Sequence, residues 1–376
     1  MSRSRLISFL ATLCLLYSMS AEAKRDTQLD HPSNVAEIQI KAAQGFVKQE
    51  LELAAAYFAG RGVAKDLAQA AYWYRKAADQ GNPAAQVYLG YLYSAGIGVP
   101  QDTAEAIRWY RRAASSNSPQ AEVNLAAHYM RGDGVKQDTA EALRLLRSAE
   151  EKGYGRADAY LGWASYTGSG VPVDNAAAEA WLKRGVKRRD PEAECFLATW
   201  DAYAPGHVPD LALEARLLRL SAATGYVPAI HGLGLLLVNH PELPQAKEEA
   251  THLLMSSAEA GYWPSSATLG ILARDGRLVP KDQRAAYRWL RIAVSQGGNQ
   301  AETHVGHELQ RLAMSVADTA CAQQEAEVWL QIHPNRDLFV FGNETTTKYF
   351  PIQEVYATAH APAVDNEVEH QAKDPD

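Results

Sequence analysis

One motif returns along most of this chain at an interval of 36 residues, and this interval limits the possible folds more than any other feature. Its first full appearance runs from Gly60 to Gly81, and its glycine, aspartate and leucine positions recur in the same register. The recurring residues include Gly62, Gly98, Gly134, Gly170 and Gly206; Asp66, Asp102, Asp138, Asp174, Asp210 and Asp282; and Leu53, Leu89, Leu125, Leu161, Leu197, Leu233 and Leu269. So many columns in one register predict an array of similar supersecondary units.

Each unit is predicted to begin with a helix that ends at a tight turn. Ala85, Leu89 and Tyr93 are four residues apart, so they lie along one side of this first helix. Gly96 and Gly98 follow them, and glycine can end a helix because it adopts a positive φ at little cost.

A second helix is predicted to begin after each aspartate of the motif. Asp102 has the position of its N-cap, and Glu105 is the expected capping-box partner. Ala106 and Trp109 form its apolar side. The expected stops of the second helices are Gly81, Asn117, Gly153, Gly225, Gly261 and Gly297. A hairpin of this kind cannot bury its apolar face alone, so the copies are expected to stack on one another.

The combined pattern, A-x-x-x-L-G-x-x-Y-x-x-G-x-G-V-x-x-D-x-x-x-A-x-x-W-x-x-x-A-A-x-x-G, resembles the Sel1-like repeat, a relative of the tetratricopeptide repeat. The resemblance covers about residues 46–312. It is strong at 49–156 and again at 265–300, is weaker at 157–192, and is degenerate at 193–264. It implies an all-α fold, an α/α superhelical solenoid of about seven 36-residue helix-turn-helix repeats with a short C-terminal extension, which holds other proteins.

The first 23 residues have the pattern of a cleaved secretory signal peptide. Arg3 and Arg5 precede the apolar run Leu6–Leu16, and Ala21-Glu22-Ala23 fits a cleavage site. The apolar run is too short to span a membrane, and no integral membrane span is expected. The expected location is the bacterial periplasm. Lipid modification at Cys14 is a weaker alternative, because the preceding Leu13 is bulky.

The first and last residues of the predicted repeats define the other segments of the chain. Residues 24–48 are predicted to form a leader and an N-terminal cap, and residues 49–300 the seven repeats. Residues 301–334 should contain a half repeat and a closing helix from Gln323 to Ile332. Residues 335–360 alternate in the manner of an extended segment or hairpin, and 361–376 have the composition of a disordered tail.

Charge and cysteine content exclude some classes of function. The net charge is −7. It becomes one unit more negative without residues 1–23, and this disfavours nucleic acid and mildly favours a basic protein partner. Cys195 and Cys321 are three repeats apart, so a disulfide between them is not expected.

A candidate binding surface lies on the first helices, on the side away from the leucine column. In solenoids built from Sel1-like repeats, the first helices line the concave face. The candidate partner-binding residues of this stripe are Tyr88, Tyr91, Asn124, Arg131, Arg156, Tyr160, Trp163, Phe196 and Tyr203. Aromatic residues with interspersed arginine are typical of binding hot spots. The alternative is that several of these rings pack between repeats; Tyr160 and Trp163 are expected to be the most exposed.

No catalytic or cofactor motif is found. The sequence lacks a G-x-S-x-G elbow, a phosphate-binding loop and an H-E-x-x-H motif. His304 and His307 share a helix face, but no third metal ligand accompanies them. The aspartate column is explained better by helix capping than by a row of carboxylate sites. We therefore expect no enzyme, no metal and no cofactor.

Two non-catalytic functions are compatible with these features. Exported Sel1-like proteins include immunity proteins that neutralise antibacterial effectors, such as phospholipases delivered by type VI secretion, and this resemblance favours a protein partner of that kind. Other members serve as envelope-assembly scaffolds in polysaccharide export or cell-wall complexes. An envelope hydrolase that uses His304 or His307 is a third, weaker possibility.

Overall fold

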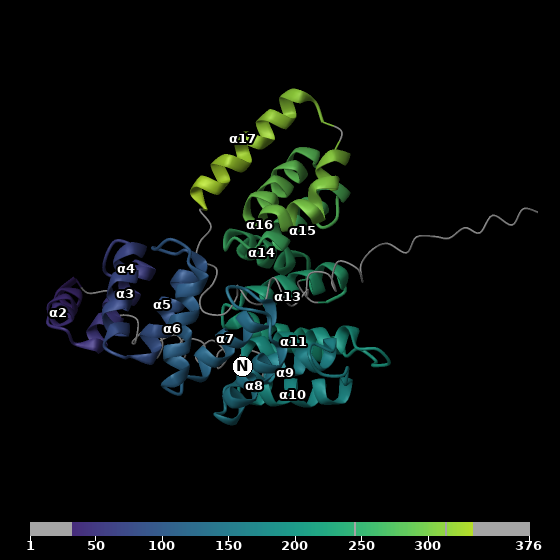
Figure 1. Cartoon of the computed structure of the whole chain (residues 1–376). Coiled ribbons are helices and arrows are strands. Elements are labelled where there is room, and N and C mark those ends of the chain that lie inside the picture. Colours follow the sequence, from purple (N-terminus) through teal and green to yellow (C-terminus); the bar gives the residue numbers. More distant parts are fainter. Residues whose placement is uncertain (1–31, 244–245, 313, 334–376) are drawn as a thin grey trace, which may run out of the picture. The chain divides into compact units, whose positions relative to one another are not determined.

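The computed structural model describes residues 32–243, 246–312 and 314–333, and all regular secondary structure in these ranges is helical (Figure 1). The helices are α2 (Pro32–Ala43), α3 (Val47–Ala59), α4 (Leu67–Asp79), α5 (Pro83–Ala95), α6 (Thr103–Ser115), α7 (Pro119–Arg131), α8 (Thr139–Glu151), α9 (Gly155–Thr167), α10 (Asn175–Lys187), α11 (Pro191–Tyr203), α12 (Leu211–Ala223), α13 (Val227–Asn239), α14 (Ala246–Glu259), α15 (Trp263–Asp275), α16 (Gln283–Arg311) and α17 (Val316–Ile332). The predicted all-α repeat solenoid is confirmed. The predicted signal peptide, residues 1–23, and the segments 335–360 and 361–376 lie outside the described residues.

The chain divides into two compact units, residues 1–161 and 162–376, each built from helical hairpins. In the first unit α3 packs on α4, α5 on α6 and α7 on α8. In the second unit α11 packs on α12, α13 on α14 and α15 on α16. Each 36-residue copy is therefore one hairpin, and this includes the two degenerate copies at 193–264.

The leucine column forms the inner side of the first helices. Leu53, Leu89, Leu125, Leu161, Leu197, Leu233 and Leu269 are all buried. Burial of a leucine side chain contributes roughly 1.5–3 kcal/mol. One such residue in every copy gives each hairpin a share of the core of its unit.

The turns follow the predicted chemistry. Gly60, Gly96, Gly132 and Gly276 end their first helices in the left-handed conformation, with φ close to 70°. Side chains of the aspartate column accept hydrogen bonds from backbone N–H groups in the first turn of the second helix: Asp66, Asp102, Asp138, Asp174, Asp210 and Asp282. The capping role of this column is confirmed.

The prediction that the Glu105 side chain completes a capping box is wrong. Glu105 does not bond back to its cap, because its carboxylate pairs with Arg108 at 2.7 Å. The backbone N–H of Asp102 donates to the carbonyl of Tyr93 instead.

Most second helices stop where glycine was expected, with one exception. In α16 the break comes one residue after Gly297, at Gly298, where φ is 54° and ψ is −139°, and a second helical segment follows this kink. A β-carbon at Gly297 would lie 2.6 Å from Cγ of Trp263. Glycine is therefore required at 297 by close packing, and the chain turns one residue later.

The two ends of the described chain carry additional helices. α2 packs on α3, where Ile38 and Ala42 form a cluster with Leu53. α17 packs on α16 and begins at Val316, earlier than the expected start at Gln323. Ser315 caps α17 by accepting a hydrogen bond from the backbone of Asp318.

Cys195 is buried and Cys321 is half-buried, and both are free thiols, as expected. Among the helices that the structure describes, none combines the length and the apolar character needed to cross a bilayer.

Candidate functional site

The predicted binding stripe is only partly accessible in the first unit. The ring of Tyr88 is half-buried and lies 5.0 Å, centroid to centroid, from that of Tyr74; burial raises the pKa of Tyr88. Asn124 is also half-buried, whereas Tyr91 is buried. Arg131 keeps 8% of its side chain exposed, with Nη2 3.8 Å from a carboxylate oxygen of Asp133.

The expectation that Tyr160 and Trp163 are the most exposed residues of the stripe is wrong. Each keeps 2% of its surface exposed. In the second unit the Trp163 ring packs 5.1 Å from that of Phe196, on the next first helix, and 5.5 Å from that of Tyr166. Phe196 is fully buried. These large rings fill space between neighbouring hairpins, as the alternative interpretation anticipated.

Besides Arg131, whose side chain is only 8% exposed, the stripe residues that keep partial exposure are Tyr88, Asn124 and Arg156 in the first unit and Tyr203 in the second. Tyr203 is held at the end of α11, where its backbone carbonyl accepts a hydrogen bond from the Tyr166 hydroxyl at 3.3 Å. These four side chains are the candidate partner contacts that the stripe retains.

A second group of polar residues was missed because it lies in a copy that we interpreted as degenerate. The copy at 193–228 has Asp201, His207 and Glu214 in three positions where the other copies have neither an acidic residue nor a histidine. The residues of the other copies are Tyr57, Tyr93, Tyr129, Ser165, Leu237 and Ala273 in the first column; Val63, Val99, Val135, Val171, Leu243 and Val279 in the second; and Ala70, Ala106, Ala142, Ala178, Ala250 and Ala286 in the third. Comparison of this copy with the others, column by column, would have revealed it.

The structure brings Asp201 and His207 together at the turn between α11 and α12, and Glu214 lies in the first turn of α12. Nε2 of His207 lies 2.7 Å from Oδ1 of Asp201, and the His207 ring lies 4.8 Å from that of Trp200. Asp201 and Glu214 are both buried. The buried environment and the Asp201 carboxylate raise the pKa of Glu214 to about 7. Burial and the neighbouring Glu214 raise the pKa of Tyr203 as well.

Metal binding finds no support in the described part of the chain, where no three His, Cys, Asp or Glu residues form a group able to hold an ion. The two histidines considered from the sequence have separate partners. Nδ1 of His304 lies 2.7 Å from the carbonyl of Gln300, and Nε2 of His307 lies 2.9 Å from a carboxylate oxygen of Glu308.

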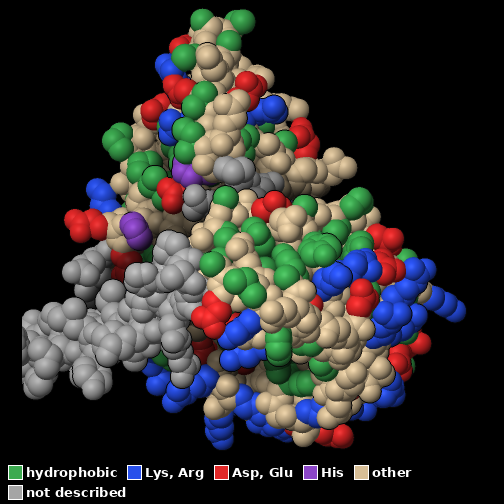
Figure 2. Space-filling model, turned by 90° about the vertical axis from the view of Figure 1, so that its left-hand side faces the viewer, with side chains coloured by type: hydrophobic (Ala, Val, Ile, Leu, Met, Phe, Trp, Pro, Cys, Tyr) green, Lys and Arg blue, Asp and Glu red, His purple; other side chains and the backbone are tan. Residues whose placement is uncertain are grey.

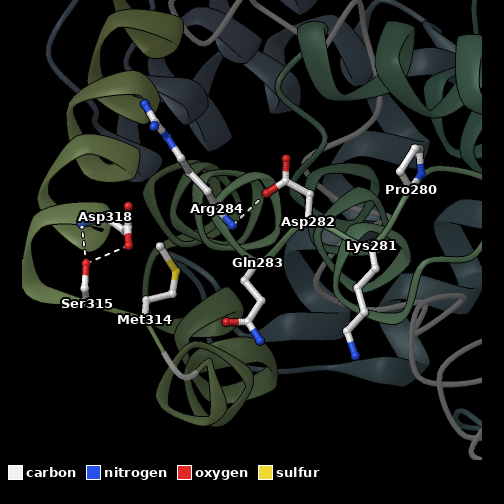
Figure 3. Close-up of a pocket in the computed structure, with 8 residues that line it drawn as sticks. All are labelled: Pro280, Lys281, Asp282, Gln283, Arg284, Met314, Ser315 and Asp318. Atoms are coloured by element: carbon white, nitrogen blue, oxygen red, sulfur yellow. Dashed lines mark hydrogen bonds between the residues drawn. The ribbon is translucent and has the colours of Figure 1, made fainter.

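A shallow pocket of about 450 Å³ lies in the second unit, between the start of α16 and the start of α17 (Figure 3). Its polar side chains mainly serve the helix ends. Asp282 caps α16, and the Ser315 hydroxyl donates to the Asp318 carboxylate at 2.6 Å (Figure 3). Arg284 donates to the Cys321 sulfur at 2.7 Å and pairs with Glu325. The pocket therefore belongs to the capping arrangement of these two helices.

Comparison with known proteins agrees with this architecture. The Sel1 repeat family model matches residues 50–82, 83–118, 119–154, 155–190 and 269–298. A Sel1 repeat protein from Oxalobacter formigenes is 31% identical, with 67% of this chain and 89% of that chain covered and a TM-score of 0.44. The comparison with curated proteins gave no match.

Two further solved structures are similar at lower identity. A protective antigen of uropathogenic Escherichia coli with an SLR fold is 23% identical, over 92% of this chain and 77% of that one, with a TM-score of 0.41. An immunity protein from Pseudomonas aeruginosa is 22% identical, over 56% and 81%, with a TM-score of 0.39.

The family match falls on the copies whose turn glycines, aspartate caps and buried leucines the structure reproduces. This chain belongs to the Sel1 repeat family, whose helical solenoids are scaffolds for protein–protein interaction.

Proposed function

We propose that this chain is a periplasmic protein-binding scaffold and, most concretely, an immunity protein that binds and sterically neutralises a secreted antibacterial effector, such as a phospholipase toxin. The proposed location depends on the signal-like sequence of residues 1–23. The proposed role is non-catalytic, because the sequence contains no nucleophile, metal or phosphate motif.

One observation supports partner binding more than any other. The core columns repeat from copy to copy, whereas the accessible stripe carries Tyr88, Asn124, Arg156 and Tyr203, which are two phenols, an amide and a guanidinium. Packing between hairpins requires the repeated residues. Packing does not require different residues at the accessible positions of the stripe. A surface that recognises one particular partner does require them.

The distribution of charge is compatible with a protein partner. On the face shown in Figure 2, acidic and basic side chains are intermingled, with lysine and arginine more numerous along its lower edge. Mixed charge of this kind provides complementarity to another protein surface. Neutralisation would then be steric: the scaffold covers the catalytic or membrane-docking surface of the effector.

The experiment is a protection assay with a toxin encoded beside this protein's gene and directed to the periplasm. Wild-type protein should protect the cells and bind the purified toxin. The double variant Tyr88→Ala with Asn124→Ala should lose both properties and keep its melting temperature. Arg147→Ala, on the exposed face of α8, is the matched control and should protect fully.

Absence of protection by the wild-type protein would refute the immunity role. Specific binding to outer-membrane export proteins or to cell wall, without protection, would show an envelope-assembly scaffold instead.

A further inference from the structure

The second helices of the first unit carry an arginine at the same position of the repeat. Arg75 on α4, Arg111 on α6 and Arg147 on α8 are 36 residues apart, and Arg112 follows Arg111 directly. Arg111, Arg112 and Arg147 are exposed, and Arg75 is half-buried. This column lies on the second helices, whereas the binding stripe lies on the first helices.

Two of these guanidinium groups are held by the hydroxyl group of a tyrosine on the next first helix. Nη2 of Arg75 donates to the Tyr93 hydroxyl, and Nη2 of Arg111 donates to the Tyr129 hydroxyl at 3.1 Å. A hydroxyl acceptor is neutral, and a guanidinium group has five N–H donors. Each of these bonds therefore orients a guanidinium group without compensating its charge, and most of its donors remain for another acceptor.

The buried indole of Trp109 holds two guanidinium groups at once. Cζ of Arg112 lies 4.6 Å from the ring centroid, and Cζ of Arg75, from the preceding hairpin, lies 5.5 Å from it. Two positive charges on one ring repel each other, and a bound anion would relieve this repulsion. Folding does not require the arrangement, because the next copy has Leu145 and Ser148 at the positions of Trp109 and Arg112.

No carboxylate in the described part of the chain forms an ion pair with any of these three arginines, on α4 or on α6. The nearby carboxylates on the second helices have other partners. Glu105 pairs with Arg108, and Glu141 pairs with Arg144, both at 2.7 Å. Asp79, one turn further along α4, is exposed and forms no ion pair with a described residue. The positive charge of this surface is therefore uncompensated.

We propose that Arg75, Arg111 and Arg112 form a docking surface for an acidic segment of a partner protein. Guanidinium groups bind carboxylates through paired hydrogen bonds, and groups already held by rings and hydroxyls lose little freedom on binding. The whole chain has a net charge of −7, so its overall field repels an acidic partner, and a local positive surface is needed to bind one.

A protein segment fits this surface better than a membrane does. Helices that lie on membranes combine basic residues with large apolar side chains that enter the headgroup region. On α4 and α6 the exposed large apolar side chains are limited to Tyr72, and Nζ of Lys76 lies 5.7 Å from its ring. The surface therefore offers charge and planar hydrogen-bond donors, but little apolar area for a bilayer.

The test measures the fluorescence anisotropy of a labelled oligoglutamate peptide of about eight residues, added to the full-length protein. The wild type should bind this peptide, and the affinity should fall as salt is added, because exposed charges are screened. An oligoglutamine peptide of the same length should not bind. Arg111→Gln with Arg112→Gln should weaken oligoglutamate binding roughly tenfold. The melting temperature should change little, because both side chains are exposed.

Arg144→Gln with Arg147→Gln, on α8, is the matched control. Both side chains are exposed, and the change removes the same amount of charge. The tyrosine and tryptophan positions that hold the proposed surface are occupied by Ser165 and Leu145 in the corresponding places of the sequence. The affinity of this variant for oligoglutamate should therefore differ from that of the wild type by less than about twofold.

Absence of oligoglutamate binding by the wild type, or an equal loss in both double variants, would overturn the proposal. Tight binding to phosphatidylglycerol vesicles that Arg111→Gln with Arg112→Gln abolishes would also overturn it, in favour of a membrane surface. If that double variant does not fold, Arg111→Gln alone should weaken peptide binding about threefold. None of these results depends on whether the chain protects cells from a toxin.

Discussion

Gly162 on α9 lies so close to Leu182 on α10 that a β-carbon at this glycine would be 2.7 Å from Cγ of the leucine. The same close approach occurs in three other hairpins. The pairs are Gly90 with Tyr110 at 2.8 Å, Gly234 with Leu254 at 2.9 Å and Gly270 with Leu290 at 2.7 Å. The glycine of the repeated Leu-Gly step therefore sets the spacing between the two helices of a copy.

This contact predicts that Gly162→Ala destabilises the protein. Alanine favours a helix by about 1 kcal/mol over glycine, but overpacking costs roughly 1–3 kcal/mol. We expect a net loss of about 1 kcal/mol in the free energy of unfolding, measured with denaturant. Pairing the change with Leu182→Ala in a double-mutant cycle should give a favourable coupling energy. Equal or greater stability of Gly162→Ala alone would contradict the tight contact.

The aspartate caps predict that removal of a capping side chain lowers the stability of the protein. Asp102→Ala removes the acceptor for the Glu105 backbone N–H and should cost about 1 kcal/mol. Asp79→Ala, at the last residue of α4, is the matched control, because an aspartate at a helix C-terminus makes no cap. The melting temperature of Asp102→Ala should be lower than that of Asp79→Ala. Similar melting temperatures would count against the capping role.

The burial of Trp163 predicts that Trp163→Ala is a core mutation. Loss of a buried tryptophan costs roughly 3–5 kcal/mol, because a cavity remains between the hairpins. Val208→Ala, at a side chain that is 84% exposed, should change the free energy of unfolding by less than about 0.5 kcal/mol. If Trp163→Ala unfolds with wild-type stability, the ring is at the surface and the original expectation is restored.

The buried His128 predicts sensitivity to acid. Burial, followed by the nearby Arg131, lowers the pKa of His128 to about 4, so the unfolded chain binds more protons between about pH 4 and 6.5. The stabilising contribution of neutral His128 is complete above pH 6.5 and is lost as pH falls towards 4. His128→Leu, with the leucine found at 92, 236 and 272, should lose less stability over this range.

The measurement is urea denaturation at a series of pH values, and the difference from wild type should reach about 3 kcal/mol at most. His307→Gln, at an exposed histidine of α16, should follow the wild-type curve. A wild-type slope in His128→Leu would show that another group causes the acid sensitivity.

Local and repeated features were predictable in detail. The turn glycines, the aspartate caps and the leucine column follow from dihedral preference, backbone hydrogen bonding and helical periodicity, which act within a few residues. The stop predicted at Gly297 lies one residue later, at Gly298, for a non-local reason. Gly297 is required by Trp263, a residue in another helix, and no local pattern distinguishes it from a helix stop.

The accessible part of the binding stripe was less predictable. Helical rotation placed Tyr88 and Trp163 on the same stripe, and yet Tyr88 remains half-exposed whereas Trp163 is sealed against Phe196. Periodicity describes one helix, whereas burial depends on which side chains the next hairpin presents.

By itself, the sequence determined that this protein is a stack of 36-residue helical hairpins, because each turn and cap is encoded by neighbouring residues. Only the tertiary structure decided which stripe residues remain open, and only it placed His207 and the Asp210 N–H against the Asp201 carboxylate. Those outcomes depend on distances between side chains of successive helices, and these distances are set when the hairpins pack together.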